Sequence, residues 1–72
     1  MFGFRGGESP DTVARKKIYM REAQDEWVFL TSYDLSTIKT EGQLISMVKD
    51  RTGRPEPEAR KNVQAWMQGK TF

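Results

Sequence analysis

The acidic side chains are the first candidates for chemistry. Glu22 and Glu26 stand four residues apart, Asp25 precedes Glu26 directly, and Glu56 and Glu58 flank a proline. Paired carboxylates can carry out acid–base catalysis when one of them lies in an apolar pocket. At these spacings, carboxylates usually form the solvated face of a helix, and 72 residues leave little room for a pocket. We therefore predict no catalytic residue and no enzymatic activity.

The residue types that most often bind metals or attack substrates are missing. The sequence has no histidine and no cysteine, which removes the commonest metal ligand, the usual general base and any thiolate. Ser46 therefore has no histidine to activate it. Gly3, Gly6 and Gly7 are not followed by the Lys and Ser/Thr of a phosphate-binding loop. The sequence predicts no metal site and no cofactor.

Basic side chains gather in the stretch "ARKKIYMR", and acidic residues follow it along the same predicted helix. This order is the reverse of the one that the helix dipole favours. Two interpretations stay open: these charges meet opposite charges on neighbouring helices, or the basic residues form a contact patch for phosphate or an acidic protein. The hypothetical partner-binding residues combine this patch with the N-terminal end: Arg15, Lys16, Lys17, Arg21, Phe2, Phe4 and Arg5.

The two tryptophans, Trp27 and Trp66, could stack on exposed nucleic-acid bases. Each of them also continues the apolar stripe of a predicted helix, which is the usual position of a core residue. We therefore predict that both tryptophans belong to the core.

Helix-start residues and apolar periodicity predict the helices that carry these side chains. Ser9 and Pro10 form a helix start, and Val13, Met20 and Trp27 then recur every seven residues on one face. A hairpin with the strands "KIYMRE" and "EWVFLT" is the alternative, because its residues favour strands. The intervening "AQD" lacks the glycine or asparagine of a tight turn, so the helix is preferred.

Three further helices follow from local signals. Thr31 with Asp34 and Thr40 with Gln43 match the capping-box pattern, and Gly53 suits a left-handed helix end. The stretch "RPEPEARKNVQAW" then opens a last helix. Its acidic residues would be repelled by phosphates, so we interpret the stretch as a structural corner and not as a DNA-reading helix-turn-helix.

The whole chain is small and nearly balanced in charge. Its net charge is +2 and its sequence pI is about 9.2, so affinity for nucleic acid would have to come from clustering. Residues 1–8 read as a flexible, glycine-rich tail, and residues 9–72 as a single helical domain. Phe2 and Phe4 of the tail could still fold back onto the core or contact a partner. The sequence shows no export signal and no long apolar run, so we expect a cytoplasmic protein without membrane contact.

The stretch from Trp27 to Trp66 resembles a known family. The matching residues are Trp27, Leu30, Thr31, Asp34, Leu35, Gln43, Leu44, the "DRTG" run at Asp50–Gly53, Ala59, Val63 and Trp66. Their order and spacing are similar to those of the CsbD-like (YjbJ-type) family of small bacterial stress-response proteins. The resemblance implies a compact helical array and no established catalytic site. The stretch "RKKIYMREAQ" stands where that family has a lysine- and glycine-rich lead-in.

The sequence therefore predicts an all-α protein, a compact array of about four short helices, that works without catalysis. The expected function is that of a bacterial stress-response or accessory protein that acts by binding a protein partner. The alternatives are a small phage-type regulator that docks on a host complex such as the transcription machinery, or a weak nucleic-acid-binding module. The partner and the oligomeric state do not follow from the sequence.

Overall fold

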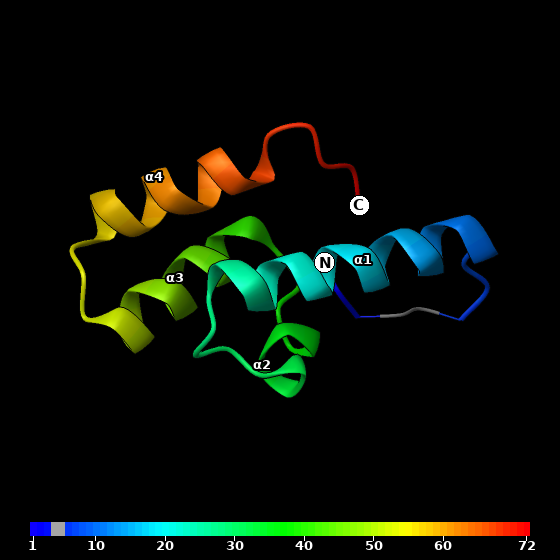
Figure 1. The fold of residues 1–72 in the computed structure, drawn as a ribbon, viewed down its shortest axis with the longest axis horizontal. Helices are drawn as coiled ribbons and strands as arrows, with labels where there is room; N and C mark the ends of the chain where they lie inside the picture. Colours follow the sequence, from blue (N-terminus) through cyan, green and yellow to red (C-terminus); the bar gives the residue numbers. More distant parts are fainter. Residues whose placement is uncertain (4–5) are drawn as a thin grey trace. The chain divides into compact units, whose positions relative to one another are not determined.

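The computed structural model describes residues 1–3 and 6–72, which contain four α-helices (Figure 1). These are α1 (Pro10–Glu26), α2 (Ser32–Ser36), α3 (Glu41–Thr52) and α4 (Glu56–Met67). The predicted all-α class is confirmed. The first helix continues unbroken to Glu26, so the helix and not the hairpin occupies this part of the chain.

Side-chain caps begin the first three helices, as the sequence predicts. The Ser9 hydroxyl accepts a hydrogen bond from the backbone in the first turn of α1. Thr31 and Asp34 form a complete capping box on α2, and Thr40 and Gln43 form another on α3. Each box satisfies two backbone N–H groups that would otherwise lack a partner within the helix. The helix starts are therefore encoded locally.

The described chain divides into two compact units. Unit 1 comprises residues 1–39 together with Phe72 and holds α1 and α2, whereas unit 2 comprises residues 40–71 and holds α3 and α4. The single domain over residues 9–72 stays a prediction. In the part of the chain that the structure describes, no helix is both long enough and apolar enough to cross a bilayer.

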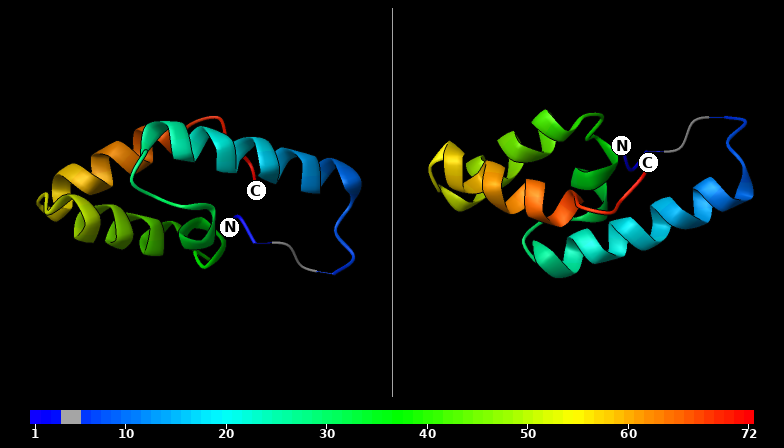
Figure 2. Two further views of the ribbon diagram at one scale, coloured as in Figure 1. Left: turned by 60° about the horizontal axis from the view of Figure 1, so that its bottom comes forward. Right: turned by 90° about the horizontal axis from the view of Figure 1, so that it is seen from above.

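Aromatic contacts bring distant segments of unit 1 together. The Phe2 and Phe72 rings meet edge to face with their centroids 5.2 Å apart, and the Tyr19 ring lies 4.9 Å from Phe72. Such pairs add specific geometry to simple apolar burial. Both panels of Figure 2 accordingly show the two chain ends close to each other. The buried apolar side chains of unit 1 are Phe2, Ala23, Trp27, Leu30, Leu35 and Ile38.

The first residues of the chain pack onto unit 1. Phe2 is fully buried, and the amino group of Met1 donates hydrogen bonds to the carbonyls of Ile38 (3.1 Å) and Lys39 (3.3 Å). This is the alternative in which the aromatic end of the expected tail folds back. The reason is that the Phe2 ring gains apolar contacts that it would lose in water. Phe2 is therefore a core residue and not the exposed contact that the sequence predicted.

Unit 2 is a helical hairpin. Figures 1 and 2 show α3 and α4 side by side, joined by the short connection at residues 53–55. Gly53 ends α3 in the left-handed region with φ 70°, which a side chain would strain. The Arg60 guanidinium lies 3.1 Å from Glu56 across one exposed helical turn. The buried side chains of unit 2 are Leu44, Ile45, Val48, Ala59 and Val63.

Trp66 corrects one prediction about the core. Trp27 is 2% exposed, as expected, but Trp66 is only half-buried. The Lys70 ammonium lies 4.3 Å from the centre of the Trp66 ring and donates a 2.8 Å hydrogen bond to the Trp66 carbonyl. A cation can lie over an aromatic face only where that face is not covered by other side chains. Trp66 is thus an amphipathic residue at the end of α4.

The two tryptophans should therefore differ in their effect on stability. Trp27→Ala removes a fully buried aromatic side chain and should lower the free energy of unfolding by about 3–5 kcal/mol, enough to unfold most of a domain this small. Trp66→Ala should cost about 1 kcal/mol, which is typical of a partly exposed site. Chemical denaturation followed by circular dichroism measures both. Equal losses for the two variants would contradict this ranking.

Candidate interaction surface

Lys16 is held inside unit 1. Its ammonium lies 2.7 Å from the Glu8 carboxylate and donates a 2.9 Å hydrogen bond to the Gly3 carbonyl. The Lys16 and Glu8 side chains are 9% and 14% exposed. A buried ammonium needs such partners, because burial removes its hydration. The structure therefore gives Lys16 a structural role, and its prediction as an exposed contact residue is corrected.

This ion pair ties the N-terminal residues to both helices of unit 1. Gly3 bonds to Lys16 on α1, and a side-chain carbon at Gly3 would come within 3.2 Å of the Ser36 carbonyl at the end of α2. Backbone atoms cannot move aside easily, so only glycine fits at this distance without adjustment. The reversed charge order of α1 thus has a partial explanation, because Lys16 lies where Glu8 and Gly3 can reach it.

The other predicted contact residues do not form one surface. Arg15 is half-buried, and within the described chain its Nε atom is buried without a hydrogen-bond partner. Lys17 and Arg21 are exposed and share one face of α1, since they stand four residues apart. Phe4 and Arg5 lie outside the described residues. Within the described residues, the basic patch therefore reduces to two exposed cations, which is little for binding phosphate.

Sequence reasoning missed an exposed apolar group in unit 1. Among the described residues, four large apolar side chains are exposed: Ile18 (55%), Val28 (83%), Phe29 (38%) and Tyr33 (76%). Three of them follow α1 closely in the chain. We call the group Val28, Phe29 and Tyr33 the apolar turn surface. Its members lie near one another in the chain, and Val28 and Tyr33 expose most of their surface, in contrast to the apolar neighbours Trp27 and Leu30.

A tight turn creates this surface. The Leu30 N–H donates to the Trp27 carbonyl at 2.9 Å, which makes Val28 and Phe29 the two central residues of a four-residue turn. Trp27 and Leu30, which flank the tip, are 2% and 3% exposed. Turn tips usually carry Gly, Pro, Asn, Asp or Ser. Two apolar residues at the tip of a turn are therefore unusual, and the turn geometry does not require them.

A signal for the turn was present in the sequence. Thr31 caps α2 with an extended backbone, so α1 must end before it and the chain between them must reverse. The run "WVFL" occupies that connection and cannot bury all four side chains there. Which two of the four face inward depends on the turn geometry, and hydrophobicity alone does not distinguish them.

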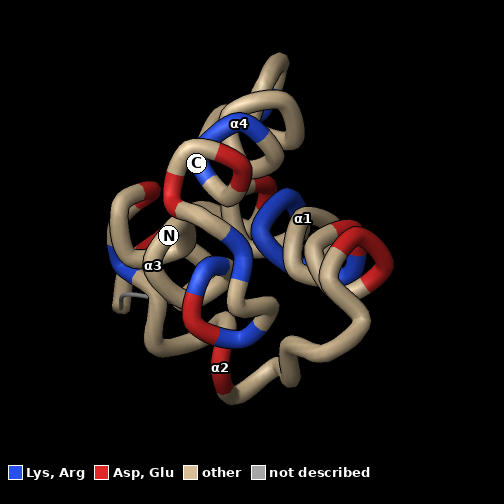
Figure 3. Tube along the Cα trace, turned by 90° about the vertical axis from the view of Figure 1, so that its left-hand side faces the viewer, with Lys and Arg blue, Asp and Glu red and all other residues tan. Residues whose placement is uncertain are grey.

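Acidic residues border the turn on its N-terminal side. Asp25 and Glu26 are exposed in the last turn of α1, which contains no basic residue. Figure 3 shows acidic positions, drawn in red, at the end of α1. Carboxylates at a helix C-terminus face the negative end of the dipole and are unfavourable by about 0.3–1 kcal/mol each when exposed. The helix dipole therefore does not account for them.

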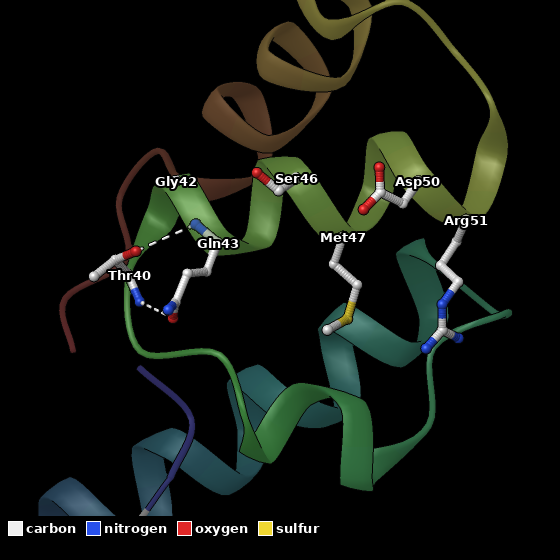
Figure 4. A pocket seen from close by; sticks show the side chains of 7 residues that line it. All are labelled: Thr40, Gly42, Gln43, Ser46, Met47, Asp50 and Arg51. Carbon is white, nitrogen blue, oxygen red and sulfur yellow. Dashed lines mark hydrogen bonds between the residues drawn. The ribbon is translucent and has the colours of Figure 1, made fainter.

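A shallow hollow on α3 of unit 2 offers no comparable chemistry. Figure 4 shows its polar end, where Thr40 and Gln43 bond to each other in the capping box. These groups already serve the helix start. Across residues 1–3 and 6–72, the acidic side chains form no group of three or more that could hold a metal ion. The hollow is lined by Thr40, Gly42, Gln43, Ser46, Met47, Asp50 and Arg51.

Comparison with protein-family models, with curated proteins and with solved structures finds no match for this chain.

Adjacent lysines test the role of the buried ion pair. Lys16→Met leaves the Glu8 carboxylate and the Gly3 carbonyl without their shared donor and should destabilise the protein by about 1–3 kcal/mol. Lys17→Met, at the exposed neighbouring position, should change stability by less than about 0.5 kcal/mol. Urea denaturation of both variants gives the comparison. If Lys16→Met were as stable as Lys17→Met, the pair would not hold the N-terminal segment.

Proposed function

We propose that this protein is a non-catalytic accessory protein that acts by binding another protein through unit 1. The observation that carries the proposal is the exposed apolar turn surface. Val28 and Tyr33 are 83% and 76% exposed, although the buried core residue Trp27 stands directly before Val28 in the chain. Clustered apolar side chains on a small protein are typical of an interaction site.

The energetics favour a protein partner. Burying a valine or an aromatic side chain contributes about 1.5–3 kcal/mol, so the three side chains together could supply a substantial part of a micromolar affinity. Tyrosine is also among the residue types enriched at protein interfaces. Nucleic acid is less well supported, because Lys17 and Arg21 are the only cations of the predicted basic patch that are exposed in the described chain.

The cellular setting of this binding rests on the sequence resemblance alone. Similarity to the CsbD-like family favours a stress-response role, whereas a phage-type regulator would use the same surface on a host complex. Both functions need a specific, reversible contact with a protein. They differ in the partner and not in the chemistry of unit 1.

Affinity capture with a competition step tests the function. The full chain is immobilised and exposed to lysate of the producing cells, and soluble full chain is then added. We expect one protein to be retained in near-stoichiometric amount and to be released by the competitor. A parallel titration with a DNA duplex should show no comparable affinity. If instead the chain bound the duplex, with an affinity that fell steeply with salt, and retained no protein, the proposal would be wrong.

A further inference from the structure

The turn is held in place by the residues that flank its tip. Trp27 and Leu30 are buried, and the Trp27 N–H donates to the Ala23 carbonyl at 2.8 Å while its carbonyl accepts from Leu30. The capping box of Thr31 fixes the chain on the other side of the turn. The tip residues Val28 and Phe29 are thus presented on a connection that is anchored at both ends, and such preorganisation lowers the entropy cost of binding.

The backbone of the turn does not require apolar side chains at Val28 and Phe29. Within the described residues, only glycines have positive φ, so Val28 and Phe29 adopt backbone conformations open to any residue. Polar side chains at these positions would keep the turn and be better hydrated. The side chain of Val28 contributes almost all of its surface to water, since it is 83% exposed. Its apolar surface is therefore available for a contact with a partner.

The charges beside the turn indicate the chemistry of the partner. Asp25 and Glu26 are exposed next to the tip, at a helix end where carboxylates oppose the dipole. Opposite charges at the edge of an interface speed association and reject wrong partners. From this geometry we infer that Val28, Phe29 and Tyr33 insert into an apolar pocket on a partner protein whose rim carries lysine or arginine side chains. This inference rests on the proposed function.

The same charges disfavour other occupants. A symmetric contact with a second copy would bring Asp25 and Glu26 of both copies together, and phosphate surfaces of nucleic acid or anionic lipid would also be repelled. Ile18, the remaining exposed large apolar side chain of the described chain, lies about two helical turns before the end of α1 at Glu26. It is thus remote from the turn tip along the helix. Ile18 is therefore outside the inferred contact and supplies a matched control.

Site-specific cross-linking identifies the occupant. A photoreactive benzoylphenylalanine replaces Val28 in the full chain, and a control protein carries it at Gln64, an exposed position on α4. After irradiation in lysate, position 28 should cross-link to one protein that position 64 does not reach. That protein is identified by mass spectrometry, purified, and titrated by calorimetry against wild type and variants. Vesicles containing phosphatidylserine and a DNA duplex are titrated in parallel.

The variants separate the apolar contact from the charged rim. Val28→Ser with Tyr33→Ser should weaken binding about 30-fold or more, because two apolar side chains are no longer buried. Ile18→Ser removes a comparable exposed side chain and should leave the affinity within about 2-fold of wild type. Asp25→Lys should weaken binding about 3- to 10-fold, with a smaller difference at high salt. Thermal melts should match wild type, since all four positions are exposed.

The outcomes distinguish this inference from the function on which it rests. If the wild-type chain captures no protein, both fail. If a protein is captured but the double variant binds it as wild type does, or Asp25→Lys binds it more tightly, only the docking turn is wrong. Cross-links to a second copy, or binding to vesicles or the duplex that the double variant loses, would likewise overturn the inferred partner.

Discussion

The buried ammonium of Lys16 is the constraint on which unit 1 depends. It holds the Glu8 carboxylate at 2.7 Å and the Gly3 carbonyl at 2.9 Å, and so fixes the first residues of the chain against α1. With this segment in place, Phe2 is buried and its ring meets Phe72. A charge that is unfavourable inside a protein is thus stabilised by two partners, and its geometry gives unit 1 contacts between residues far apart in sequence.

The exposed apolar side chains of the candidate surface lie in the connection after α1 and at the start of α2, and these two helices position them. The turn after α1 buries Trp27 and Leu30 and exposes Val28 and Phe29 between them. The same four-residue reversal therefore anchors the core and forms the surface. Because Val28 is 83% exposed, its side chain can change without removing a core contact, whereas Phe29 is 38% exposed and keeps most of its surface covered.

Local signals made the helices predictable. Thr31 and Thr40 each form a reciprocal capping box, and Gly53 adopts a left-handed backbone that ends α3. These interactions span only a few residues, so they can be recognised before any tertiary contact is known. The apolar periodicity likewise identified Trp27 as a buried position. The all-α class and the division into four helices followed from such short-range rules.

The sequence by itself determined the helix starts and the end of α3 at Gly53, because each depends on neighbours within one or two turns. Tertiary structure alone decided the fate of Lys16, Phe2 and Trp66. Lys16 became structural because Glu8 and Gly3 reach it, and Trp66 stayed half-buried with Lys70 over its ring. Tertiary structure also decided which half of "WVFL" points outward. Hydrophobicity assigns all four side chains to the core, but a reversing chain has room to bury only the two at its base.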